Sequence, residues 1–198
     1  MARYVTLKGP QDAPKAEKLG YPLVLKIDSP DIIHKTDIGG VKVGINSEEE
    51  LRAAAQEILE AARRKAPHAR IYGLVAQEML QGYELFIGAL NDPQFGPVVA
   101  FGLGGIFVEL LHDVAFDLAP LTPSQALDLI SHTRGSRLLQ GYRGREPANT
   151  QLLAQVISRF SHLAYQLHAV LVEADLNPTY ASKDWVKVAD ARFHLKPP

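Results

Sequence analysis

Lysine, histidine and glycine residues suited to phosphate chemistry lie close together in one short stretch of the sequence. Lys26 stands inside an apolar run at residues 23–27, and a second apolar run begins after Gly39 and Gly40. A lysine beside a glycine-rich turn can hold phosphate, because the ammonium is a point charge and small residues let backbone N–H groups approach an anion. A lysine that reaches solvent from an edge strand is the alternative. The stretch therefore indicates a phosphate site but leaves a solvated lysine open.

His34 lies between the two apolar runs, after Ser29, which can cap a single helical turn. A neutral imidazole can accept a phosphoryl group and pass it on. A histidine on a loop is nevertheless most often only a surface residue. His34 is therefore a candidate nucleophile, and an exposed side chain without a role is the alternative.

Oxygen-bearing side chains gather near the C-terminus. If residues 171–177 are extended, Asp175 and Asn177 point to one face, because strand side chains alternate. A turn centred on residues 183–184 would place Asp190 opposite Asn177 on the return strand. One carboxylate and one amide oxygen suit Mg²⁺, which takes oxygen ligands and completes its shell with water and phosphate. A hairpin that merely exposes a polar face is the alternative.

The hydrophobic pattern predicts the elements that position these residues. Ser47 and Glu50 form a capping box that starts one helix, and Thr122 with Pro123 starts another. Because strands and helices are mixed without strict alternation, we expect mixed α+β lobes. Strands are predicted at residues 4–7, 23–27, 41–45, 71–80, 84–90, 97–101, 171–176 and 185–193; helices at 12–20, from 47 towards Pro67, from 122, and around 152–167.

A local basic loop is expected at residues 134–150, which carry four arginines. They are Arg134, Arg137, Arg143 and Arg145. A solvated surface is the first interpretation of this loop, and a contact with an anion or with coenzyme A (CoA) is the second.

Composition excludes several classes of protein. The chain has 198 residues, of which 46% are hydrophobic and 22% are charged, as in an ordinary globular protein. No apolar run approaches the roughly 20 residues that span a bilayer, and the first residues lack the apolar core of a signal peptide. With no cysteine there is no disulfide or thiolate nucleophile, and a net charge of −1 argues against a nucleic-acid binder. We expect a cytoplasmic protein that binds neither membrane nor nucleic acid.

Taken in order, several stretches resemble the ATP-grasp domain of NDP-forming acyl-CoA synthetases such as ADP-forming acetyl-CoA synthetase. The matching stretches are YPLVLKIDSPDIIHKTDIGGVKVG, YGLVAQEML, DPQFGPVVAFGLGGIFVELLHDVAF, LLQGYRGREPAN, VEADLNP and VKVADAR. The same domain type also occurs as a regulatory domain in Pat-like protein acetyltransferases, which leaves a non-catalytic nucleotide-binding domain as the alternative function.

The resemblance implies an ATP-grasp fold of two lobes, expected at residues 1–75 and 76–198, with ATP or ADP between them. It implies that Lys26 binds phosphates and that His34 accepts phosphate from a phosphohistidine on a CoA-binding subunit or fused domain, then hands it to ADP. It implies a Mg²⁺ ion at Asn177 and Asp190, near Asp175. The other nucleotide contacts that it implies are Gly39, Gly40, Gln77, Glu78, Met79, Glu84, Gly104 and Gly105.

Two departures from the family pattern accompany this resemblance. Asp117 stands where family members carry an arginine, and a reversed charge beside a phosphate site would weaken anion binding. The family domain also begins with a further helix and loop ahead of the stretch at residues 4–19. We therefore expect the chain to need a CoA-binding partner, as in a hetero-oligomer, to complete the acyl-CoA reaction.

Overall fold

The computed structural model describes residues 1–105 and 112–197, which form two compact units. The N-terminal unit is Ala2–Leu80, and the C-terminal unit is Gln81–Pro198 together with Met1. The boundary expected after residue 75 falls inside a strand, β4 (Gly73–Glu78), which belongs wholly to the N-terminal unit. In the described part of the chain no helix is both long and apolar enough to cross a membrane.

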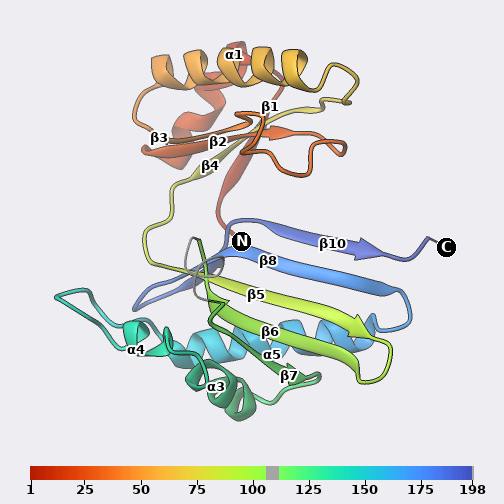
Figure 1. The fold of residues 1–198 in the computed structure, drawn as a ribbon. Helices are drawn as coiled ribbons and strands as arrows, with labels where there is room; N and C mark the ends of the chain where they lie inside the picture. The colour runs from red at the N-terminus through yellow and green to blue at the C-terminus, as the bar shows by residue number, and fades with distance from the viewer. Residues whose placement is uncertain (106–111, 198) are drawn as a thin grey trace. The chain divides into compact units, whose positions relative to one another are not determined.

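The N-terminal unit contains a four-stranded antiparallel sheet in the order β1-β4-β2-β3. Its strands are β1 (Tyr4–Leu7), β2 (Leu23–Asp28), β3 (Val41–Ile45) and β4. The helices η1 (Pro10–Leu19) and α1 (Glu48–Lys65) pack on one face (Figure 1). Alternate residues Leu23, Leu25 and Ile27 are buried in this core, so the residues between them face the other side of the sheet.

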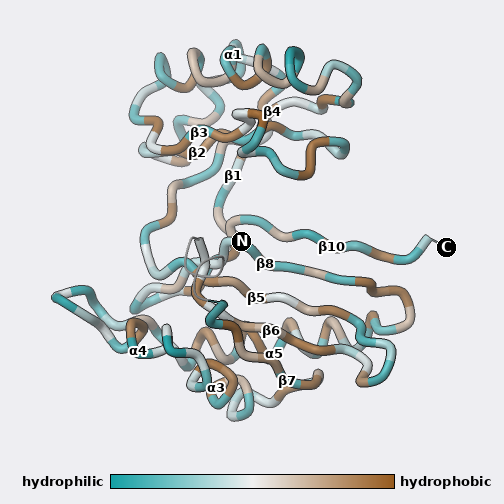
Figure 2. Tube along the Cα trace, in the orientation of Figure 1, coloured by the Kyte–Doolittle hydropathy of each residue, from teal (hydrophilic) through white to brown (hydrophobic). Residues whose placement is uncertain are grey.

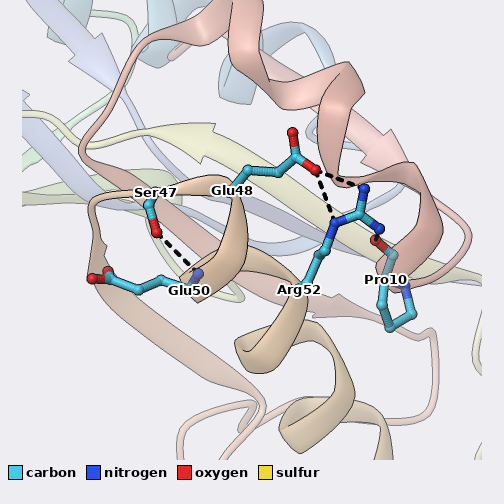
Figure 3. A network of polar contacts seen from close by, with 5 residues as sticks. All are labelled: Pro10, Ser47, Glu48, Glu50 and Arg52. Atoms are coloured by element: carbon cyan, nitrogen blue, oxygen red, sulfur yellow. Dashed lines mark hydrogen bonds and ion pairs between the residues drawn. The ribbon is translucent and has the colours of Figure 1, made fainter.

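The serine cap predicted at the start of α1 is confirmed: the Ser47 hydroxyl accepts a hydrogen bond from the Glu50 N–H at 3.1 Å (Figure 3). The reciprocal bond of a capping box differs from the prediction, because the Glu50 carboxylate reaches past Ser47 and accepts from the Asn46 N–H at 2.7 Å. One turn later, Arg52 donates to the Glu48 carboxylate at 2.6 Å and to the Pro10 carbonyl at 3.2 Å. These contacts fix the start of α1 and tie it to η1. Along the tube in Figure 2, α1 alternates between hydrophilic and hydrophobic residues, as an amphipathic helix does.

The C-terminal unit is built on a second antiparallel sheet, in the order β10-β8-β5-β6-β7, with β9 paired to β8. The described residues of this unit include the helices α3, α4 and α5, and α3 and α5 pack on one face of the sheet (Figure 1). The strands are β5 (Tyr83–Asp92), β6 (Gly96–Leu103), β7 (Val114–Leu118), β8 (Leu171–Ala181), β9 (Val186–Val188) and β10 (Ala191–Leu195); the helices are α3 (Pro123–Ser131), α4 (Ser136–Leu139) and α5 (Thr150–Gln166).

Four elements differ from those predicted. The first helix is a 3-10 helix, and it contains Pro14, which has no N–H to donate. The short helix α4 lies inside the segment expected to be a loop. Strand β7 was not predicted, although four of its five residues are apolar; it is a short, half-exposed strand at the edge of the sheet. The last predicted strand is two strands, β9 and β10, interrupted at residues 189–190.

Candidate functional site

Lys26 lies on an interior strand of the N-terminal sheet. Strand β2 has neighbours on both sides, and Lys26 pairs with Val75 of β4 and Val41 of β3. The edge-strand alternative for Lys26 is therefore wrong. Since the residues on either side of Lys26 are buried under α1, its half-buried side chain faces the side of the sheet that α1 does not cover. A cation held among valines on a sheet face suits a ligand that has both an apolar ring and an anionic tail.

Gln77 and Glu78, at the end of β4, point to opposite sides of the sheet. Gln77 pairs with Val24, so it shares the face of Lys26, where it is only 5% exposed. The Glu78 carboxylate instead accepts hydrogen bonds from the Arg3 N–H at 2.8 Å and from Arg3 Nε at 3.1 Å. Met79 follows, and its N–H donates to the Pro22 carbonyl at 3.2 Å. The nucleotide contacts predicted at Gln77 and Glu78 therefore lie on opposite faces of the sheet.

His34 is exposed on the loop that joins β2 to β3. Gly39 and Gly40 end this loop, and their N–H groups donate to the carbonyls of Thr36 and Lys35, at 2.9 and 2.7 Å. Gly40 is buried, and a Cβ atom there would lie 2.8 Å from Cγ2 of Ile27. The two glycines close the turn against the core. Their amides are donors inside the loop, so any phosphate contact here must use other groups.

An ion pair anchors the loop three residues before His34. Asp31 accepts from the Arg70 guanidinium at 2.7 and 3.0 Å and from the Arg70 N–H at 2.7 Å. Hydrogen bonds from the guanidinium, followed by the one from the backbone N–H, lower the pKa of Asp31 to about 2. This anchor was not predicted, because its two residues are 39 positions apart in the chain.

Acidification is expected to remove the stabilisation that this anchor provides. Because the pKa of Asp31 is about 2 in the folded protein against an ordinary 3.8, the contribution is fully present above about pH 4 and is lost as the pH falls towards about 2. The difference in thermal stability between the wild type and Asp31→Asn should therefore shrink over this range. Asp37→Asn, in the same loop, is the matched control. A difference that stays constant with pH would contradict the ion pair.

The predicted C-terminal hairpin forms in the expected register. Pairs of Leu176 with Ala191 and of Thr179 with Val188 flank Asn177, whose N–H donates to the Asp190 carbonyl at 3.0 Å. Asn177 and Asp190 are therefore opposite each other, as the turn at residues 183–184 predicted. Among the described residues no group of three histidine, aspartate or glutamate side chains could hold a metal by itself. This donor set fits Mg²⁺, which takes few protein ligands beside water and phosphate.

Asp175 lies two residues before Asn177, on the face of the C-terminal sheet opposite α3 and α5. It pairs with Gly88 of β5 and Arg192 of β10 and is half-buried. Partial burial is the largest cause that raises the pKa of Asp175; Arg192 lowers this pKa, and the charges of Asp190 and Glu173 raise it. A nearby cation would relieve the repulsion among these carboxylates.

Glu84, Gly104 and Gly105 form one cluster in the same unit. The Gly104 N–H donates to the Glu84 carbonyl at 2.8 Å, and a Cβ atom on Gly104 would lie 2.8 Å from Cγ of Glu84. Gly105 has a φ of 62° and also lies beside the Glu84 carboxylate. The hydroxyl of Tyr180 donates to that carboxylate at 3.4 Å, and burial followed by the Glu84 charge raises the pKa of Tyr180 to about 12. The sequence analysis missed Tyr180, which only strand pairing brings to Glu84.

Asp117 does not share the face of the candidate metal ligands. On β7 it pairs with Val99, which is buried beneath the helices, whereas Asp175 is on the opposite face. Its carboxylate accepts a hydrogen bond from the neighbouring Leu118 N–H at 2.8 Å. The negative charge expected beside a phosphate site is therefore directed to the other side of this sheet.

Comparison with known proteins identifies the family of this chain. The family model described as "ATP-grasp domain" matches residues 2–195. The beta subunit of acetate–CoA ligase [ADP-forming] I from Pyrococcus furiosus is 45% identical, covering 90% of this chain and 77% of that subunit. The fused acetate–CoA ligase [ADP-forming] I from Archaeoglobus fulgidus is 42% identical, but this chain spans only 26% of it.

Solved structures match nearly the whole chain. The dinucleotide forming acetyl-coenzyme A synthetase 1 of Ca. Korarchaeum cryptofilum, in complex with coenzyme A, Ca-AMPCP and HgCl+, matches with a TM-score of 0.93 and 42% identity over 99% of this chain and 86% of that chain. Another structure of that enzyme, which contains a phosphorylated phosphohistidine segment, matches with a TM-score of 0.85 and 40% identity over 99% of this chain and 86% of that chain. The chain therefore belongs to the ATP-grasp family, as a beta subunit or domain of the type found in ADP-forming acid–CoA ligases.

Proposed function

We propose that this chain binds ADP or ATP and transfers a phosphoryl group between a phosphohistidine of a CoA-binding partner and ADP. The observation that carries the proposal is the arrangement of one strand and the loop that follows it. Lys26 is held on an interior strand, facing away from the core, and His34 is exposed on the anchored loop that leaves the same strand. A fixed cation and an accessible imidazole are the two groups that phosphoryl transfer through a histidine needs.

Each side chain has a distinct part in this step. Lys26 binds the nucleotide phosphates and offsets their charge. An imidazole nitrogen of His34 attacks the phosphorus, the bond to the donor histidine breaks, and the P–N bond to His34 then breaks as an oxygen of ADP takes the phosphoryl group. Asn177 and Asp190, near Asp175, would hold a Mg²⁺ ion, which neutralises charge on the phosphates when bound.

The subunits and domains of the relatives indicate which partner this chain needs. Beta subunits of ligases and fused ligases both carry this domain, and solved relatives contain coenzyme A. We infer that a CoA-binding subunit or domain completes the net reaction, acyl-CoA + ADP + phosphate ⇌ acid + CoA + ATP. A non-catalytic regulatory domain, as in Pat-like acetyltransferases, is not favoured, since the relatives from Pyrococcus furiosus and Archaeoglobus fulgidus are named as ligases.

Calorimetry with Mg-ADP and Mg-ATP tests the nucleotide site. Lys26→Met keeps most of the side-chain stem and removes the charge, so we expect ADP affinity to fall about 10- to 100-fold, the worth of a charge-assisted hydrogen bond. Lys42→Met is the matched control, because Lys42 is on the neighbouring strand and pairs with Glu57 of α1 at 2.6 Å. Failure of the folded wild type to bind either nucleotide would overturn the proposed function.

A further inference from the structure

We propose that a basic depression at the end of α3 and the start of α4 binds a phosphate group of a ligand. The depression has a volume of about 450 Å³ and is lined by Ser131, His132, Thr133, Arg134, Ser136 and Arg137. These residues lie at the end of α3 and in α4, helices of the C-terminal unit (Figure 1). Asp175 is on the face of the sheet that α3 and α5 do not cover, because its neighbours Ala174 and Leu176 are buried in the core. None of them is among the predicted contacts with nucleotide or metal.

The charge of this segment favours an anion. Residues 131–145 contain four arginines and no aspartate or glutamate, although the whole chain has 22 acidic and 21 basic residues. Within the described part of the chain, the side chains of Arg134 and Arg137 have no ion pair or hydrogen bond. By contrast, Arg145 stacks over the Tyr83 ring at 4.5 Å and donates to the Gly82 carbonyl. Two exposed guanidinium groups are therefore left facing solvent at the depression.

The backbone beneath the two arginines is firmly held. The Asp113 carboxylate accepts hydrogen bonds from the N–H groups of Arg134 and Gly135, at 2.8 and 2.6 Å. A Cβ atom on Gly135 would lie 2.4 Å from the Leu103 side chain, so this turn packs directly on the core. The Asp113 carboxylate is thus occupied by backbone N–H donors of the segment. The scaffold thus fixes the positions from which the two side chains reach outward.

The hydrogen bonds at the depression select the kind of ligand. The hydroxyls of Ser131, Thr133 and Ser136 donate to backbone carbonyls at 2.7 to 2.9 Å, so they are not free as donors. The donors left are the guanidinium groups and the His132 ring. Two planar guanidinium groups, each with several N–H donors, match the oxygens of a phosphate monoester or of free phosphate better than those of a single carboxylate. The shared chemistry is a phosphate dianion, supplied either by inorganic phosphate or by a phosphate ester such as the 3′-phosphate of CoA.

Nuclear magnetic resonance of the full chain tests the site by following the Arg Nε–H signals. The titrations use the Lys26→Met background, so that phosphate bound at the nucleotide site does not contribute and failure of the proposed function leaves this result readable. We expect saturable shifts of the Arg134 and Arg137 signals with inorganic phosphate, with CoA, or with both. A response to CoA but not to 3′-dephospho-CoA would identify the 3′-phosphate as the ligand group.

Substitution of both arginines supplies the decisive comparison. The double variant Arg134→Gln with Arg137→Gln should weaken binding of the probe at least tenfold. The double variant with lysine at both positions keeps the charges but loses the paired N–H donors of guanidinium, so its affinity should be intermediate. Arg143→Gln, in the same segment but outside the depression, is the matched control and should bind as the wild type does. Both target side chains are exposed, so circular dichroism should show an unchanged fold. Unchanged affinity in the Gln double variant, or no saturable shift with any of the three probes, would overturn the proposal.

Discussion

Replacing His34 with glutamine is expected to lower the rate of phosphoryl transfer to ADP by about 10³-fold or more, because an amide cannot form the P–N bond on which the transfer depends. Nucleotide affinity should change little. His34 is exposed, and the loop is held elsewhere, by Asp31 with Arg70 and by Lys65, which donates to the Asp37 carbonyl at 3.2 Å. The substitution should therefore stop phosphoryl transfer through His34 without unfolding the protein.

The measurement is acid-labile, base-stable ³²P label on this chain after incubation with a phosphorylated CoA-binding partner. Wild-type protein should acquire the label and release it to ADP, whereas His34→Gln should acquire none. His68→Gln is the matched control, since His68 is also an exposed loop histidine of the N-terminal unit. Label that persists in His34→Gln would exclude His34 from the transfer, although the nucleotide site could remain intact.

The second large effect concerns magnesium. Asp190→Asn is expected to abolish most of the magnesium dependence of ADP binding and to lower the affinity for Mg-ADP about 10- to 100-fold, as the loss of one charged ligand implies. The substitution is nearly isosteric. The Asp190 carboxylate accepts a hydrogen bond from the Ala191 N–H at 3.0 Å, which an amide oxygen can still accept, so the hairpin should stay intact.

Calorimetric titration of ADP across a range of magnesium concentrations measures this effect. Asp184→Asn is the matched control, because Asp184 is an exposed carboxylate in the turn of the same hairpin. It should keep the full magnesium dependence. If Asp190→Asn kept it as well, the metal ligands would have to be sought among other residues.

Local patterns in the sequence predicted the features of the fold that depend on residues close together in the chain, such as helix starts and hairpin register. The capping box at Ser47 marked the start of α1, and counting outward from the turn at residues 183–184 gave the pairing of Asn177 with Asp190. The apolar run around Lys26 also predicted the strand that carries it. Strand β7 was not predicted, since its five residues are mostly apolar on both faces and show no period-2 alternation that would mark a strand.

Contacts between distant segments could not be predicted in the same way. The attachment of Asp31 to Arg70, of Glu78 to Arg3 and of Tyr180 to Glu84 depends on strand order, which periodicity does not encode. The opposite orientation of Gln77 and Glu78, by contrast, could have been predicted from the sequence, because successive residues of a strand point to opposite faces. The roles of these side chains in nucleotide binding stay predictions for the experiments described above.

The anchor of the His34 loop is open to solvent, with 32% of the Asp31 side chain and 69% of the Arg70 side chain accessible. Mobile ions weaken such a contact far more than they weaken a hydrophobic core, since the screening distance shortens to roughly 3 Å at molar salt. Rising ionic strength should thus loosen the loop that carries His34, while both sheets stay folded. At high salt concentration, the conformation of the His34 loop would therefore change before the stability of the two sheets does.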